Sequence, residues 1–150
     1  MIDLAELRDE NRSAVRRWHE AALHDLELAE LLAERGFYSD ACFYAQQTAE
    51  KALKAFLRAR GLSPWGHRVE ELLRAAAEEG LDVADLLSPD RIGQVKSLSD
   101  QYLAPRYPDF RERLGLRLED YTREQALAFI ELAREVLRRV EVCLRREGWI

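Results

Sequence analysis

Long apolar runs are absent from this sequence of 150 residues. A membrane-spanning helix needs about 18 consecutive apolar residues, and no stretch of the chain comes near that length. The N-terminal segment, MIDLAELRDE, is acidic and lacks the basic and apolar regions of a signal peptide. We therefore expect a cytoplasmic protein that has no membrane segment.

Cysteine is also scarce. Cys42 and Cys143 are too few for a disulfide framework, and they lack the paired spacing of a zinc site. We expect both to be small core residues, and we expect neither a metal ion nor a cofactor. The net charge of −5 argues against broad, non-specific attraction to nucleic acid, although a local basic stripe is compatible with it.

Alternation of apolar and polar residues with a period of two, typical of half-buried strands, is missing as well. Apolar residues recur every three or four positions, which predicts five amphipathic helices, over residues 11–35, 39–60, 64–79, from 88–89 onward, and 122–147. Residues 3–10 either extend the first helix or fray. The sequence thus predicts an all-α protein in which residues 1–150 form one antiparallel, up-down helical bundle.

Two of the predicted helices begin at residues that favour an N-cap. Ser39 suits the start of the second helix, and Thr122 suits the start of the last one, where Gln125 would complete a capping box. The last helix is long enough to pair with the first along its full length. Because its final residues, GWI, leave apolar bulk at the chain end, we expect the tail to lie in a dimer interface.

The second predicted helix carries polar residues near its apolar stripe. Gln46 points in the direction of that stripe, so we expect it to be at least partly buried and hydrogen-bonded. Glu50 lies at the edge of the stripe, and Lys54 follows four residues later, in the orientation that favours an ion pair on one helix.

The segment QYLAPRYPDF, residues 101–110, places Arg106 and Tyr107 between two prolines. Residues that precede proline are biased toward extended backbone, so we expect this segment to be stiff and to hold its side chains in fixed positions. A guanidinium fixed in this way suits bidentate binding to a phosphate or to a carboxylate of its own chain, such as Glu50, Asp100 or Asp109.

If Arg106 binds a phosphate, other residues would complete a shallow site for a nucleotide. Tyr107 would stack on a base, and His67 and Lys54 would add hydrogen bonds or positive charge near Glu50. The alternative role of His67 is a cap or a hydrogen bond between a loop and the bundle, and the alternative role of Arg106 is the internal ion pair.

Taken in order, these segments resemble the HEPN domain (higher eukaryotes and prokaryotes nucleotide-binding). The resemblance covers about residues 14–142 and is carried by QQTAEKALKA (46–55), HRVEELL (67–73) and YLAPRYPD (102–109). It implies an up-down helical bundle and a homodimer. It also implies one of two roles, because some members are metal-independent ribonucleases, whereas others bind nucleotides or act beside a small nucleotidyltransferase.

The ribonucleases of this family carry an arginine that is followed, after four to six residues, by a histidine on a later helix. No histidine follows Arg106 anywhere in this chain. Three pairs elsewhere have that spacing, and the abundance of arginine makes such matches expected by chance: Arg12 with His19, Arg17 with His24, and Arg60 with His67. The missing histidine argues against nuclease activity.

The resemblance and the residues together favour a non-catalytic module that binds nucleotides or a nucleotidyltransferase encoded nearby. One alternative is an endoribonuclease toxin of a toxin–antitoxin pair, with His67 and Arg106 assembled across a dimer. Another is a purely structural dimerisation scaffold, in which Gln46, Glu50 and Arg106 only specify the bundle.

Overall fold

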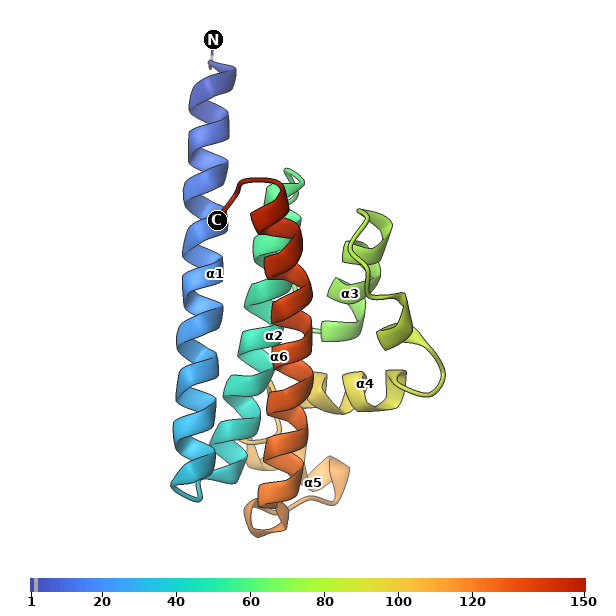
Figure 1. Ribbon diagram of the computed structural model, residues 1–150. Helices are drawn as coiled ribbons and strands as arrows, with labels where there is room; N and C mark the ends of the chain where they lie inside the picture. The colour runs from blue at the N-terminus through green and yellow to red at the C-terminus, as the bar shows by residue number, and fades with distance from the viewer. Residues whose placement is uncertain (2) are drawn as a thin grey trace.

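The computed structural model of the chain describes residue 1 and residues 3–150. Within these residues all regular secondary structure is helical, which confirms the all-α prediction (Figure 1). The described α-helices are α1 (Leu4–Glu34), α2 (Tyr38–Ala59), α3 (Val69–Glu78), α4 (Ile92–Asp100), α5 (Pro108–Leu114) and α6 (Arg123–Arg146). Two short 3-10 helices, η1 (Ala84–Leu87) and η2 (Leu118–Asp120), precede α4 and α6.

The three long helices α1, α2 and α6 form the body of the bundle (Figure 1). A tight turn reverses the chain between α1 and α2, so these two helices are antiparallel, as predicted. Helix α6 runs parallel to α2, because the intervening residues return the chain to the end at which α2 begins. Helix α6 packs mainly on α2 and less on α1, so the predicted full-length pairing of α6 with α1 is wrong.

Many of the buried positions of α1 and α2 are alanine. Ala22 and Ala29 of α1 are fully buried, as are several alanines of α2: Ala41, Ala45, Ala49 and Ala52. Small side chains allow two helices to approach at the short end of the usual interaxial range of about 8–10 Å. Larger side chains of α2, including Leu53 and Phe56, are fully buried in the same core.

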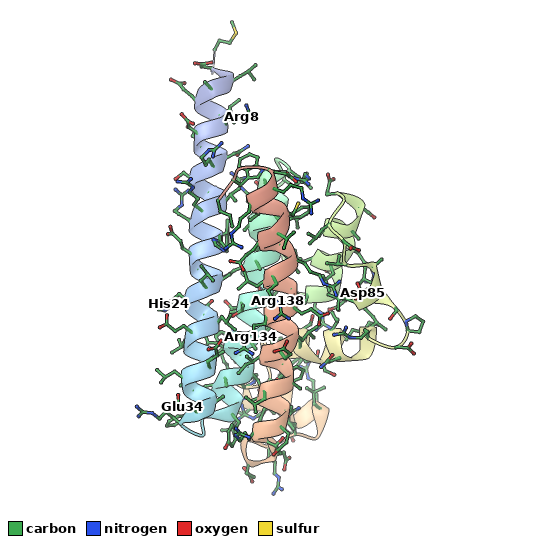
Figure 2. All side chains as sticks on the ribbon, viewed as in Figure 1. Arg8, His24, Glu34, Asp85, Arg134 and Arg138 are labelled. Atoms are coloured by element: carbon green, nitrogen blue, oxygen red, sulfur yellow. The ribbon has the colours of Figure 1, made fainter. Side chains whose placement is uncertain are left out.

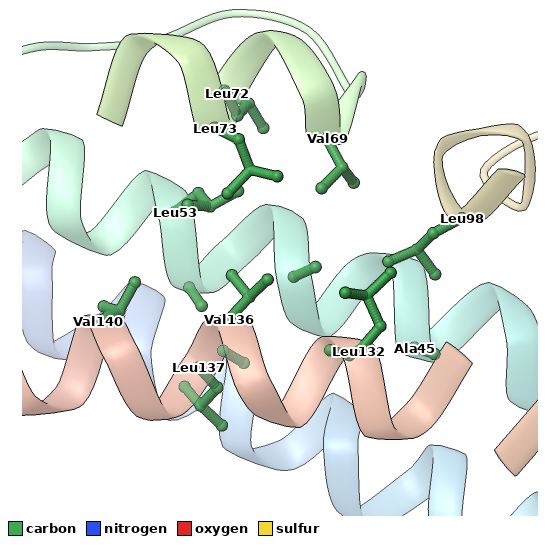
Figure 3. Close-up of a cluster of buried hydrophobic side chains, with 14 of the residues drawn as sticks. Ala45, Leu53, Val69, Leu72, Leu73, Leu98, Leu132, Val136, Leu137 and Val140 are labelled. Carbon is green, nitrogen blue, oxygen red and sulfur yellow. The ribbon is translucent and has the colours of Figure 1, made fainter. Parts of the chain in front are cut away.

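Helices α3 and α4 cover the side of α2 that lies away from α1 (Figure 1). Figure 3 shows Leu73 of α3 reaching toward Leu53 of α2, and Leu98 of α4 reaching toward Leu132 of α6. All four side chains are fully buried. Burial of an aliphatic side chain of this size contributes roughly 1.5–3 kcal/mol, so this cluster fixes the smaller helices on the long ones.

Several predicted helix starts differ from the observed ones. Helix α1 begins at Leu4, because Asp3 provides an N-cap by accepting a hydrogen bond of 3.1 Å from the amide of Ala5. Helix α2 begins at Tyr38, so Ser39 lies in its first turn and is not the cap. Thr122 does cap α6, through a 3.2 Å hydrogen bond from the Gln125 amide to its hydroxyl.

The start of α3 was also misplaced, because this helix begins at Val69 and not at Pro64. Gly66 has φ of +92°, a conformation that a right-handed helix cannot contain. Residues 62–68 therefore form a loop without regular structure, and His67 lies on that loop and not at the opening of a helix. This loop runs from the end of α2 to the start of α3, and we call it the 62–68 loop.

Helix α5 was not predicted. Tyr107 is its N-cap, with φ −120° and ψ 113°, and Pro108 occupies the first turn. Gly115 ends the helix in the left-handed region, with φ of +66°. The proline and glycine signals were present in the sequence, but only seven residues lie between Tyr107 and Gly115, too few for an apolar stripe to reveal the helix.

The chain end packs on its own molecule. The carbonyl of Gly148 accepts a 2.6 Å hydrogen bond from Arg12, and the carbonyl of Trp149 accepts a 3.3 Å bond from Arg16. Trp149 and Ile150 also pack against the core. The tail is therefore covered by α1, and a dimer interface is not needed to explain its apolar residues.

The first turns of α1 extend beyond the rest of the bundle, where Arg8 is labelled in Figure 2. Leu4 and Leu7 are exposed on this projecting end. None of the helices in the described part of the chain combines the length and the apolar character that crossing a membrane would require.

Candidate functional site

A polar row interrupts the buried face of α2. Gln46, Glu50 and Lys54 follow one another at intervals of four residues, so all three project from one side of the helix. Their exposed fractions are 0% for Gln46, 4% for Glu50 and 7% for Lys54. The burial predicted for Gln46 is confirmed, and the Glu50–Lys54 ion pair is present but buried, with 3.0 Å between Nζ and Oε2.

The carboxylate of Glu50 accepts three hydrogen bonds. Oε2 accepts the bond from Lys54, and Oε1 accepts bonds from Gln46 Nε2 at 3.1 Å and from His67 Nδ1 at 2.9 Å. Gln46 Nε2 also donates to the carbonyl of His67 at 2.9 Å. We call these four residues the Glu50 network. It fastens the 62–68 loop to α2, so the predicted hydrogen bond between loop and bundle exists.

His67 is oriented by this network. A carboxylate can only accept, so the proton of the neutral ring lies on Nδ1 and Nε2 is left as an acceptor. The side chain is 44% exposed, and its ring stacks on Tyr102 with 3.8 Å between centroids and 15° between planes. His67 is thus half accessible to solvent and fixed on two sides.

Arg106 does not form the internal ion pair that was one of its two predicted roles. Among the residues that the structure describes, no carboxylate lies within 4.0 Å of its guanidinium. Glu50 is bound to Lys54 and His67, and Asp100 pairs with Arg68 at 3.0 Å. The Nε of Arg106 instead donates to the carbonyl of Tyr102 at 3.1 Å.

The backbone explains the difference. The amides of Leu103 and Ala104 both donate to the carbonyl of Asp100, and those of Arg106 and Tyr107 donate to the carbonyl of Leu103. Residues 101–106 are therefore coiled in turns, whereas the prediction was an extended segment. The coil folds the side chain of Arg106 back over aromatic rings.

Three rings surround the guanidinium of Arg106. Its Cζ lies 4.6 Å from the ring centre of Phe43, 4.8 Å from that of Tyr102 and 5.2 Å from that of Tyr107. Since His67 stacks on the same Tyr102, the structure brings His67, Arg106 and Tyr107 together. We call these residues the Arg106 surface: Phe43, His67, Tyr102, Arg106 and Tyr107.

Phe43 and Tyr102 were missed as site residues. Tyr102 is half-buried and lies beyond the end of α4. Phe43 precedes Gln46 by three residues and Glu50 by seven, a spacing that places it on the polar row of α2. That spacing was the available signal in the sequence.

Lys54 lies on the other side of the Glu50 network from the Arg106 surface. Its ammonium is 5.5 Å from the ring centre of Trp18 on α1, and it lines a cavity with residues of α1. The structure thus does not place Lys54 among the rings that hold Arg106. Its link to His67 runs through the two oxygens of Glu50.

The Arg106 surface combines positive charge, aromatic faces and a half-exposed imidazole. Cation–π contacts hold a guanidinium in place without neutralising its charge, so the remaining N–H groups can bind an anion. Stacking on exposed rings suits a nucleic-acid base, and Tyr107 is 50% exposed. In the described part of the chain, no group of three or more His, Cys, Asp or Glu side chains is arranged to hold a metal ion.

The three arginine–histidine pairs with nuclease spacing are engaged elsewhere. His19 bonds to Glu141 of α6 at 2.7 Å, and Arg60 forms a bidentate pair with Glu147. Arg17 donates to Ser13, and His24 is exposed on the outer face of α1 (Figure 2).

Comparison with known proteins gives consistent matches. The model of the HEPN domain matches residues 15–143, close to the expected 14–142. A protein of Methanocaldococcus jannaschii named "Putative toxin MJ1304" is 31% identical over 130 residues, which cover 84% of this chain and 85% of that protein.

Two solved structures are also similar. The crystal structure of TT1696 from Thermus thermophilus has a TM-score of 0.71 and 37% identity, covering 85% of this chain and 95% of that one. The crystal structure of ST0689, described as an archaeal HEPN homologue, has a TM-score of 0.68 and 34% identity, covering 87% and 97%. The fold, the motifs and these matches establish that the chain belongs to the HEPN family.

Proposed function

We propose that this HEPN protein is a non-catalytic module that binds the phosphates of a nucleotide or of single-stranded RNA through the Arg106 surface. The observation that carries the proposal is the environment of Arg106. Its guanidinium lies on three aromatic rings, and no carboxylate among the described residues neutralises it.

The neighbouring groups support the same ligand. A base can stack on the exposed ring of Tyr107, and His67 can donate a hydrogen bond from Nε2 to a phosphate oxygen when its ring is protonated. The carboxylate of Glu50, 2.9 Å from Nδ1, holds the ring so that Nε2 points away from the Glu50 network. The net charge of −5 then limits binding to this local surface.

Binding of a fluorescein-labelled, single-stranded RNA measured by fluorescence anisotropy tests the proposal. We expect Arg106→Gln to weaken binding about tenfold, or 1.4 kcal/mol. Because a single strand releases about 0.7 counterion per neutralised phosphate, we also expect the slope of log K against log salt to fall by about 0.7.

The matched control is Arg138→Gln, which removes an exposed arginine on α6 that pairs with Glu131 (Figure 2). We expect this variant to bind RNA as the wild type does. Equal losses in the two variants would show non-specific attraction and would contradict the proposal. If Arg106→Gln lowers the unfolding temperature but leaves RNA affinity intact, the structural scaffold is the better explanation.

A ribonuclease toxin is the second candidate, and one observation favours it. Glu50 fixes His67 with Nε2 exposed, and His67 and Arg106 share the Tyr102 ring, as an acid–base group and a phosphate ligand would. The relative named as a toxin fits the same role. Cleavage of RNA at its 2′-hydroxyl needs a base and also an acid for the leaving oxygen, so a second copy would have to supply the other group.

Incubation of end-labelled RNA with the protein in EDTA separates the two candidates. We expect intact RNA in the lanes of the wild type and of the variants His67→Ala and Arg106→Gln. Cleavage by the wild type that is lost in both folded variants would contradict the binding module and would show a metal-independent endoribonuclease.

We further propose that the protein acts as a homodimer in the cytoplasm beside a small nucleotidyltransferase, in a toxin–antitoxin arrangement. The toxin named among its relatives supports this context. Light scattering measures the mass of the assembly. Co-expression with a nucleotidyltransferase encoded next to the gene tests the partner, and the two proteins eluting separately would count against it.

A further inference from the structure

The basic cavity that Lys54 lines is open to solvent and lies beside the 62–68 loop. It has a volume of about 350 Å³ and is lined by α1, the C-terminal half of α2 and the loop. No carboxylate among the described residues belongs to its lining. The lining does contain three cations and two tryptophans: Arg17, Lys54, Arg58, Trp18 and Trp65.

The two arginines of this cavity lack acidic partners. Arg17 donates to the hydroxyl of Ser13 at 2.6 Å, and Arg58 donates to the hydroxyl of Ser63 and to Asn11 Oδ1 at 3.3 Å. Within the described residues neither guanidinium has a carboxylate within 4.0 Å, although the chain has 28 acidic residues. Two guanidinium groups held by neutral acceptors keep their charge for an anionic ligand.

The tryptophans indicate what the rest of that ligand is. Trp18 is half-buried beneath the cavity, with its ring 5.5 Å from Lys54 Nζ. Trp65 is 94% exposed and stands at the rim, next to Gly66 with its φ of +92°. An indole with almost no apolar cover is rare on a protein surface, and a flat ring of the ligand would provide the cover.

We propose that this cavity binds a phosphorylated aromatic ligand, namely a nucleoside phosphate. Its phosphate contacts Arg17 and Arg58, and its base stacks on Trp65. The ligand is either a free nucleotide or one nucleotide unit of an RNA strand, since both present the same base and phosphate. The cavity shares no residue with the Arg106 surface, so the proposal is independent of RNA binding there.

Isothermal titration calorimetry with AMP, adenosine and a 5′-phosphorylated oligoadenylate tests the proposal. The variants are Trp65→Ala and Arg17→Gln, which alter exposed side chains and leave the core intact. We expect each to weaken AMP binding at least about fivefold, because stacking on one aromatic side chain or one phosphate contact is worth that much. Adenosine, which lacks the phosphate, should bind more weakly than AMP.

Two control variants localise the effect. Arg138→Gln should leave AMP binding unchanged, and Arg106→Gln separates AMP bound at the Arg106 surface from AMP bound in the cavity, which Arg106 does not line. AMP binding that depends on Trp65 and Arg17 supports the cavity with a free nucleotide as ligand. Binding of the oligonucleotide alone, with the same dependence, supports it with an RNA strand as ligand.

Three results would overturn the proposal. The first is the absence of binding heat with AMP and with the oligoadenylate at about 1 mM. The second is equal AMP affinity in the wild type and both cavity variants. The third is loss of AMP binding in Arg106→Gln alone. The last result would assign the nucleotide to the Arg106 surface. Because the two proposals are tested with different variants, the results can contradict one of them without contradicting the other.

Discussion

The carboxylate of Glu50 holds groups from α2 and from the 62–68 loop together. It is 4% exposed and accepts hydrogen bonds from Lys54, His67 and Gln46. A buried carboxylate would be costly alone, and the ammonium of Lys54, itself 7% exposed, would be costly without it. The ion pair as a whole therefore adds little net stability, but removing one of its two partners would destabilise the fold strongly.

We expect Glu50→Ala to lower the free energy of unfolding by about 3–5 kcal/mol, because it leaves a buried ammonium without a partner. Urea unfolding monitored by circular dichroism measures the loss. Adding Lys54→Met to the same chain removes the unpaired charge and should restore part of the stability. A loss below about 1 kcal/mol in the single variant would mean that water reaches Lys54.

At the scale of helices, the sequence was informative wherever periodic apolar residues and caps agreed. The cap at Thr122 predicted the start of α6, and the spacing of the apolar residues of α2 predicted the burial of Gln46. Helix α5 was missed because it is short. The start of α3 was misplaced because the sequence does not show that Gly66 adopts a positive φ, which a helix cannot contain. Short elements and glycine conformations depend on contacts that spacing does not record.

In the candidate site, too, the contact within one helix was predicted and the contacts between elements were not. Pairing of Glu50 with Lys54 lies within one helix, so the four-residue spacing predicted it. The partners of Arg106 come from α2 and from the coil after α4, and the arginine lies on Phe43 and Tyr102 instead of a carboxylate. Such a contact is set by how the elements pack, and no local pattern specifies it.

At the scale of the whole molecule, arginine–carboxylate pairs connect the outer segments to α6. Arg139 of α6 binds both carboxylate oxygens of Asp85 in η1, and Arg60 after α2 binds both oxygens of Glu147 after α6. Figure 2 shows Asp85 on the segment beside α6, far along the chain from its partner. These pairs add charge-assisted hydrogen bonds between segments that the hydrophobic core also joins.

We expect these pairs to make the protein sensitive to acid. The hydrogen bond from Arg139 lowers the pKa of Asp85 from 3.8 to about 2, and that from Arg60 lowers the pKa of Glu147 from 4.5 to about 2. A carboxyl group whose pKa is depressed on folding stabilises the protein above its unfolded pKa. That contribution is lost as the pH falls through the folded value. The free energy of unfolding should therefore decline between about pH 4.5 and pH 2.

Urea unfolding at a series of pH values measures this decline, and the double variant Asp85→Asn with Glu147→Gln isolates its source. The variant cannot bind protons at these positions, so its stability should be lower than that of the wild type near neutrality and should depend less on pH in the acidic range. Both side chains are partly exposed, so added salt should reduce the difference. An unchanged acid slope in the double variant would place the proton-linked stability in other carboxylates, and the connection of η1 and α2 to α6 would then rest on apolar packing.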